Sequence, residues 1–115
     1  MRDDLSRLRD VVRAIDRIQE ETCVSRATFA EDAKLQVWVL YHLQIIGEAA
    51  RSLSAEFREL FPDPVWSKAV GLRNILVHHY FEIDEELIWQ VVEQDLTPFR
   101  ETARAALRKL EAQKT

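Results

Sequence analysis

Residues 28–53, with the sequence TFAEDAKLQVWVLYHLQIIGEAARSL, decide the fold of this chain. Thr28 and Glu31 have the spacing of a capping box, which predicts that a helix begins here and runs to about Leu53. The middle of this helix, residues 37–46, is apolar on nearly every side. Because such a helix is buried on most sides, we expect it at the centre of a helical bundle or at a dimer surface.

Apolar side chains recur at spacings of three and four residues on both sides of this segment, as in amphipathic helices. The pattern predicts a helix over residues 5–18, a short helix from Ser54 to Leu60, a third major helix from Pro64 to about His79, a segment that begins at Asp84, and a last helix that begins at Pro98. Residues 95–98 are interpreted as a break, because Thr97 is a suitable helix cap. Gly47 and the two alanines after Glu48 favour a close helix crossing.

Two further sets of side chains are interpreted from helical spacing alone. The tryptophans at positions 38, 66 and 89 fall on the apolar stripes, so we expect them in the core. The first helix carries alternating charges opposite its apolar stripe, namely Arg7, Arg9, Asp10, Arg13, Asp16 and Arg17. We interpret these as a solvated face with weak pairs along the helix.

The composition excludes several classes of protein. The chain has 115 residues, which suits one domain, and its two glycines are too few for a many-stranded sheet or a glycine-rich phosphate loop. The single cysteine, Cys23, offers no intramolecular disulfide and no ligand set for structural zinc. We therefore expect one all-α domain over residues 1–115, an antiparallel bundle of four to five helices.

The formal net charge of −4 argues at first against a nucleic-acid partner. The excess of negative charge is local, however. Residues 82–95 hold six acidic side chains and no basic one, whereas residues 100–114 hold five basic and two acidic ones. A few cations near a site, doubled by dimer symmetry, are enough for a salt-sensitive grip on RNA. Since no signal peptide or membrane span is recognised, we expect a cytoplasmic protein with no membrane partner.

The segment whose side chains are suited to catalysis is Arg73–Tyr80, RNILVHHY. Asn74 and His78 are four residues apart and share a helical face, while Arg73 lies on a neighbouring face. A guanidinium suits phosphate, an imidazole exchanges protons near neutral pH, and an amide orients or donates. The set is sufficient for metal-independent RNA cleavage, and no metal is predicted. The alternative is that Arg73 and His79 only stabilise a helix end through its last carbonyls.

The string Arg73-Asn74 followed by His78 and Tyr80, placed late in a helical bundle, resembles the HEPN superfamily and its HepT-like toxin branch. Three other stretches resemble that branch, namely YHLQIIGEAA at 41–50, Phe61-Pro62, and FEID at 81–84. The resemblance covers essentially the whole chain, and no motif position departs from the pattern.

The resemblance implies a single HEPN-like domain that forms a homodimer, with two copies of the motif facing each other. Arg73 and His78 would be the catalytic pair of a metal-independent endoribonuclease, and Asn74 a supporting polar residue. Tyr80 would accept AMP from a nucleotidyltransferase antitoxin, which silences the toxin by bulk and negative charge. The expected partners are RNA, that antitoxin and a second copy, within a homodimer or a larger hetero-oligomer.

Three further residues are kept as supporting candidates. His42 and Glu48 lie in the central helix and are expected to face the dimer cleft if they act, although a lone histidine there is more often a core group. His79 is interpreted first as a helix-end residue. No cofactor is expected. Two alternatives to the toxin stay open: a non-catalytic helical dimer that only binds a nucleotidyltransferase or nucleotide, and a purely structural dimer.

Overall fold

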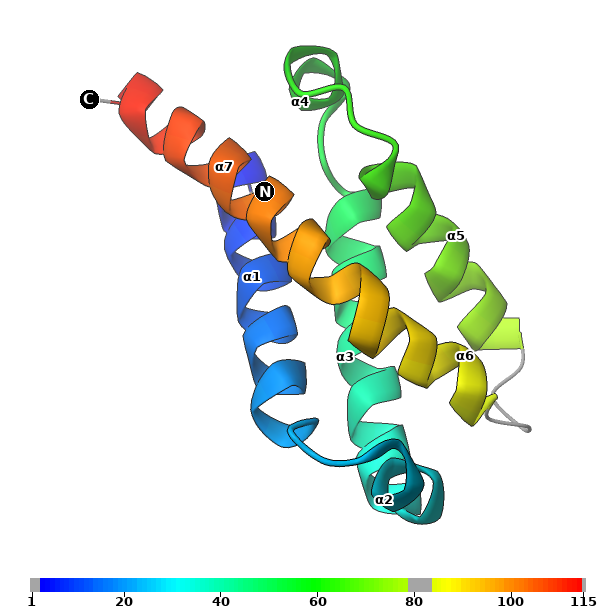
Figure 1. Ribbon diagram of the computed structural model, residues 1–115. Helices are drawn as coiled ribbons and strands as arrows, with labels where there is room; N and C mark the ends of the chain where they lie inside the picture. Colours follow the sequence, from blue (N-terminus) through cyan, green and yellow to red (C-terminus); the bar gives the residue numbers. More distant parts are fainter. Residues whose placement is uncertain (1–2, 79–83, 115) are drawn as a thin grey trace.

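The computed structural model describes residues 3–78 and 84–114 (Figure 1), and within these ranges it is helical with no strand. The elements are α1 (Asp4–Glu21), α2 (Arg26–Glu31), α3 (Ala33–Arg51), α4 (Ala55–Leu60), α5 (Val65–His78), α6 (Glu85–Gln90), the π-helix η1 (Val91–Asp95) and α7 (Leu96–Lys114). The all-α prediction is therefore confirmed.

Four long helical segments make up the bundle, and the short helices α2 and α4 lie in its connections. Figure 1 shows that α1, α3 and α5 run in alternating directions, with α3 between the other two. The continuous run α6–η1–α7, here called the rod, crosses this layer and packs against α1 and α3. This arrangement agrees with the expected antiparallel bundle of four to five helices.

The core lies where α1, α3 and the rod meet. The apolar stripe predicted for the first helix is buried as expected, and its partners come from α3 and the rod; the fully buried side chains include Leu8, Ile15, Ile18, Val39, Ile88 and Leu96. At about 25 cal/mol per Å² of apolar surface, burial of these side chains is the main force that assembles the helices.

The predicted helix over residues 28–53 is interrupted, which corrects the sequence interpretation. The N-cap of α2 is Ser25, whose hydroxyl accepts a hydrogen bond from the backbone N–H of Thr28 at 3.1 Å. Asp32 ends α2 and caps α3, accepting from the N–H of Leu35 at 3.0 Å. Because a short carboxylate competes well for free amides at a helix start, Asp32 begins a new helix instead of continuing the old one.

The break expected at residues 95–98 is also absent, because η1 joins α6 to α7. Pro98 has no N–H to donate to the carbonyl of Gln94, as an α-helix would require. In the preceding turn, the N–H of Leu96 bonds to the carbonyl five residues back, on Val91. Val91 and Leu96 are both buried while Asp95 is exposed, so the wider turn keeps an aspartate out of the core without ending the helix.

One face of α3 remains uncovered by the described residues. Val37, Trp38 and Tyr41 are 54%, 41% and 60% exposed. The prediction that Trp38 belongs to the core is therefore wrong for the single chain, whereas Trp66 is buried as predicted. The central helix is thus packed on two sides and under the rod, and it carries an apolar strip on its open side.

Candidate functional site

The helix that carries the Arg73 motif is anchored at its start by Trp66. The buried indole packs against the rings of Phe57 and Phe99, and its Nε1 donates a hydrogen bond to the carbonyl of Phe61 at 3.0 Å. Asp63 accepts from the N–H of Val65 at 2.9 Å, which helps the helix begin after the two prolines. The motif therefore lies on a helix whose first turn is fixed to the core.

Further along, α5 crosses α3 at Gly47. An added Cβ on Gly47 would lie 2.2 Å from the Cβ of Arg73 and 3.2 Å from the carbonyl oxygen of Ala69. No side chain fits in this space, so only glycine allows the helices to approach this closely. The close crossing expected from the small residues is confirmed, and it places Arg73 directly against α3.

At this crossing the Arg73 guanidinium forms an ion pair with Glu48, with an Nη2–Oε1 distance of 2.5 Å. The Arg73 side chain is 24% exposed and that of Glu48 is 49% exposed, so the pair lies at the surface beside the crossing. The Nη1 group of Arg73 also donates to Oδ1 of Asn74 at 3.4 Å, while its Nε is buried without a partner. Three predicted site residues are thus brought together.

The remaining motif residues are described only in part. His78 is the last residue of α5, five residues and therefore about 7.5 Å along the helix axis from Arg73. The side chain of His78 lies outside the described residues, as do His79 and Tyr80.

His42 is placed apart from this cluster. Its ring is 1% exposed, contacts the rings of Trp38 and Tyr41, and has Nδ1 at 2.8 Å from the carbonyl oxygen of Trp38. Because a carbonyl only accepts, Nδ1 is the protonated nitrogen in this contact. Six residues separate His42 from Glu48, or about 120° around the helix, so the two side chains do not share a surface.

A hollow of about 280 Å³ adjoins Glu48, and Arg73 is not among its lining residues. Its lining comes from α1 and α3 and consists of Arg7, Asp10, Tyr41, Gln44, Ile45, Glu48 and Ala49. The position of Arg7 corrects the interpretation of its helix face as simply solvated, since its Nε is buried. The alternation of Arg and Asp on α1 gave no sign of this, because helical spacing does not show which neighbouring helix a charge meets.

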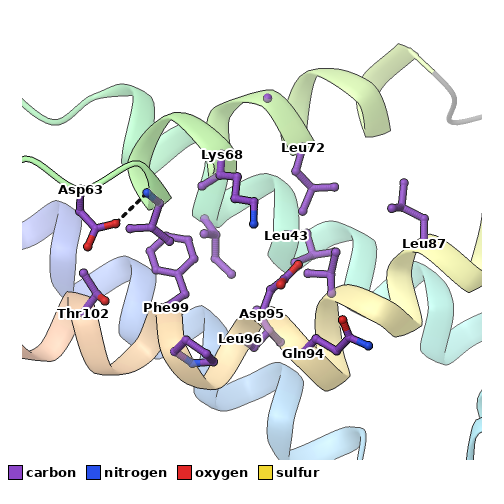
Figure 2. A pocket seen from close by; sticks show the side chains of 16 residues that line it. Leu43, Asp63, Lys68, Leu72, Leu87, Gln94, Asp95, Leu96, Phe99 and Thr102 are labelled. Carbon is purple, nitrogen blue, oxygen red and sulfur yellow. Dashed lines mark hydrogen bonds between the residues drawn. The ribbon is translucent and has the colours of Figure 1, made fainter.

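A larger groove, of about 520 Å³, separates α5 from the rod (Figure 2). Its walls are mainly apolar and include Leu43, Leu72 and Phe99, with Lys68 and Asp95 on opposite sides. Neither Arg73 nor Glu48 lines this groove. The polar cluster is therefore a surface site on α3 and α5, distinct from this groove.

Metal-ligating clusters and membrane-spanning helices are both absent from the described ranges. Within residues 3–78 and 84–114, no three or more His, Cys, Asp or Glu side chains are grouped so that they would hold a metal ion. Across the same part of the chain, every helix is too short or too polar to cross a membrane.

The fold and the site define a small helical-bundle protein with an arginine–carboxylate pair at a helix crossing. Within that class, the chain belongs to the HepT-like ribonuclease family, because the family described as Ribonuclease HepT-like matches residues 11–106. The match includes α3, α5, α6, η1 and the first half of α7. It therefore includes both helices that form the site.

Individual relatives agree with the family. A relative in Methanocaldococcus jannaschii, named "Putative RNase", is 46% identical over 68 residues, which cover 59% of this chain and 62% of the relative. The "Probable ribonuclease HepT" of Thermococcus cleftensis is 35% identical over 92 residues, covering 77% of this chain and 82% of that protein. The chain thus spans less than two thirds of the first relative. No solved structure matches the chain.

Proposed function

We propose that this protein is the toxin of a toxin–antitoxin pair, a metal-independent endoribonuclease that acts through Arg73 and His78 in an Arg-x4-His motif. The family match and the names of the relatives support ribonuclease chemistry. The observation that carries the proposal is the Arg73 guanidinium, held by Glu48 at the Gly47 crossing on the same helix as His78.

The proposed reaction needs one proton acceptor, one proton donor and one fixed positive charge. His78 takes the proton from a ribose 2′-hydroxyl, and the resulting oxygen attacks the adjacent phosphorus. A 2′,3′-cyclic phosphate forms as the bond to the 5′-oxygen breaks, and an acid protonates that leaving oxygen. Arg73 stabilises the charge on the phosphoryl oxygens, and Asn74 beside it supplies an amide to orient the phosphate.

The homodimer is part of this proposal. The exposed strip of Val37, Trp38 and Tyr41 lies on α3, the helix that also carries Glu48. Burying such a strip against a second copy removes apolar surface from water and brings two Arg73 sites near one interface. The buried position that the sequence predicts for Trp38 would then be reached in the dimer.

Control of the toxin is proposed to act at Tyr80, through AMP transferred by a nucleotidyltransferase antitoxin. Negative charge added two residues after His78 would repel an RNA phosphate from Arg73. A Tyr80→Phe protein should therefore stay active in the presence of the antitoxin and ATP, and intact-mass spectrometry should show no added AMP. Modification of this variant to the wild-type level would disprove the assignment.

The test of catalysis is cleavage of RNA by the purified protein in EDTA. Arg73→Ala and His78→Ala should each lower the rate by about 10²–10⁴-fold, the usual contribution of such groups. Arg13→Ala, a change at an exposed residue of α1, is the matched control and should cleave normally. If the wild type binds the antitoxin but leaves RNA intact, the protein is the non-catalytic binding module instead.

A further inference from the structure

The hollow between α1 and α3 holds an arginine with unused hydrogen-bonding capacity. The Nε of Arg7 is buried and has no partner, and its two Nη groups, which are not among the buried unpartnered atoms, reach solvent. Among residues 3–78 and 84–114, no carboxylate forms an ion pair with Arg7, whereas Arg9, Arg26, Arg73 and Arg100 each have one. Arg7 is therefore a partly desolvated cation whose guanidinium has hydrogen-bond donors without partners.

The carboxylates that share the hollow form no ion pair with this cation. Glu48 is paired with Arg73, and Asp10 is engaged in an interaction of its own. Arg7 and Arg73 thus lie on the two sides of Glu48, one on α1 and one on α5. The amide of Gln44 lines the same hollow and adds a hydrogen-bond donor. A guanidinium beside an amide donor is suited to phosphate, whose oxygens accept hydrogen bonds from its parallel N–H groups.

We propose that Arg7 binds a backbone phosphate of the RNA strand that flanks the cleaved bond. The inference rests on the proposed ribonuclease function and extends the path of the RNA from Arg73, over Glu48, to α1. Arg7 is a binding residue in this scheme and takes no part in proton transfer. Its contribution is electrostatic and independent of base identity, as phosphate contacts are.

The test compares Arg7→Ala with Arg13→Ala, an equal loss of charge at an exposed position on the same helix. Binding of a single-stranded RNA oligonucleotide is measured by fluorescence anisotropy at several salt concentrations, with His78→Ala added to prevent cleavage. Arg7→Ala should weaken binding about tenfold and reduce the slope of log K against log salt by about 0.7, the value of one phosphate contact to a single strand. Arg13→Ala should change neither quantity.

Cleavage kinetics supply a second readout that a merely structural role would not reproduce. In the otherwise unaltered protein, Arg7→Ala should raise KM with little change in kcat, and Arg7→Lys should restore most of the salt slope because it keeps the charge. If Arg7→Ala unfolds the protein, as circular dichroism would show, Arg7→Gln keeps the side-chain stem and is used instead.

Each remaining result overturns a different claim. Equal salt slopes for the Arg7 and Arg13 variants would refute the phosphate subsite while the ribonuclease function stands. A change of oligomeric state in Arg7→Ala, with the salt slope unchanged, would assign Arg7 to contact between copies. A wild-type protein that neither binds nor cleaves RNA would refute the proposed function itself.

Discussion

The two glycines of the chain lie inside helices and in opposite surroundings. At Gly47 an added Cβ would collide with the Cβ and Cγ of Arg73, whereas at Gly71 it would meet nothing within 4 Å. Glycine in a helix costs about 1 kcal/mol relative to alanine, so its presence needs a reason in the packing. The reason is visible for Gly47, where it lets Arg73 reach Glu48.

Substitution of each glycine by alanine should have opposite effects on stability. Gly71→Ala should raise the free energy of unfolding by about 0.5–1 kcal/mol, because the backbone loses freedom in the unfolded chain and the new methyl group meets open space. Gly47→Ala should lower it by about 1–3 kcal/mol through overpacking against α5. Urea denaturation of the two variants checks both values, and equal stabilisation by both would contradict the crossing described for Gly47.

The ion pair of Glu48 should matter more for activity than for stability. Because both partners are partly exposed, Glu48→Gln should lower the free energy of unfolding by less than about 1 kcal/mol. The freed Arg73 side chain loses its fixed position, so kcat for RNA should fall severalfold. Glu111→Gln breaks the exposed pair with Arg9 and serves as control, with kcat unchanged. A Glu48→Gln enzyme with normal kcat would show that Glu48 does not position Arg73.

At the residue scale, the sequence indicates which side chains are neighbours on one helix. Arg73 and Asn74 are adjacent in the chain, and their contact in the structure follows from that. The approach of Glu48 depends on how α5 packs against α3, which spacing along one helix does not specify. Arg7 was missed for the same reason, since its role depends on the helix opposite.

At the scale of elements, the misjudged boundaries have a common cause. Asp32 and Pro98 are both residues that disturb a helix, and the sequence alone does not show whether the chain bends or adapts there. At Asp32 the carboxylate found a free N–H to cap, and a new helix began. On either side of Pro98, Leu96 and Phe99 are buried, and the helix continues through the wider turn of η1.

The π-helix determines which of two adjacent residues is buried. In a regular α-helix the residue four after Val91 would follow it into the core, and that residue is Asp95. Since the wider turn buries Leu96 instead, Leu96→Ala should cost about 2–5 kcal/mol of unfolding free energy. Asp95→Ala should stay within about 0.5 kcal/mol of the wild type. Chemical denaturation that ranks the two variants the other way would contradict the π turn.

At the scale of the whole molecule, the all-α bundle was predictable because it depends on apolar periodicity, which each helix carries in its own sequence. The stripe on α1 and the nearly all-apolar α3 specify a buried centre without knowledge of any loop. The sequence left open whether α3 lies at the centre of the bundle or at a dimer surface, because an apolar residue that contacts a second copy has the same pattern as one buried within the chain. Trp38 is the clearest example.

The open face of α3 should hold the proposed dimer together. A Val37→Glu/Trp38→Glu double variant places charges on exposed positions, so the single chain should fold normally but remain monomeric in light scattering coupled to size exclusion. Leu60→Glu, at a 62% exposed leucine of α4, is the control and should not alter the mass. A double variant that remains dimeric would place the contact between copies elsewhere.

The groove beside α5 bears on the local stability of that helix. Beyond Trp66, α5 rests chiefly on α3, while the groove separates it from the rod. Segments with few buried contacts open locally at a lower free energy than the whole domain unfolds. We therefore expect the half of α5 that carries Arg73, held mainly by α3, to open at a lower free energy than the rest of the bundle unfolds.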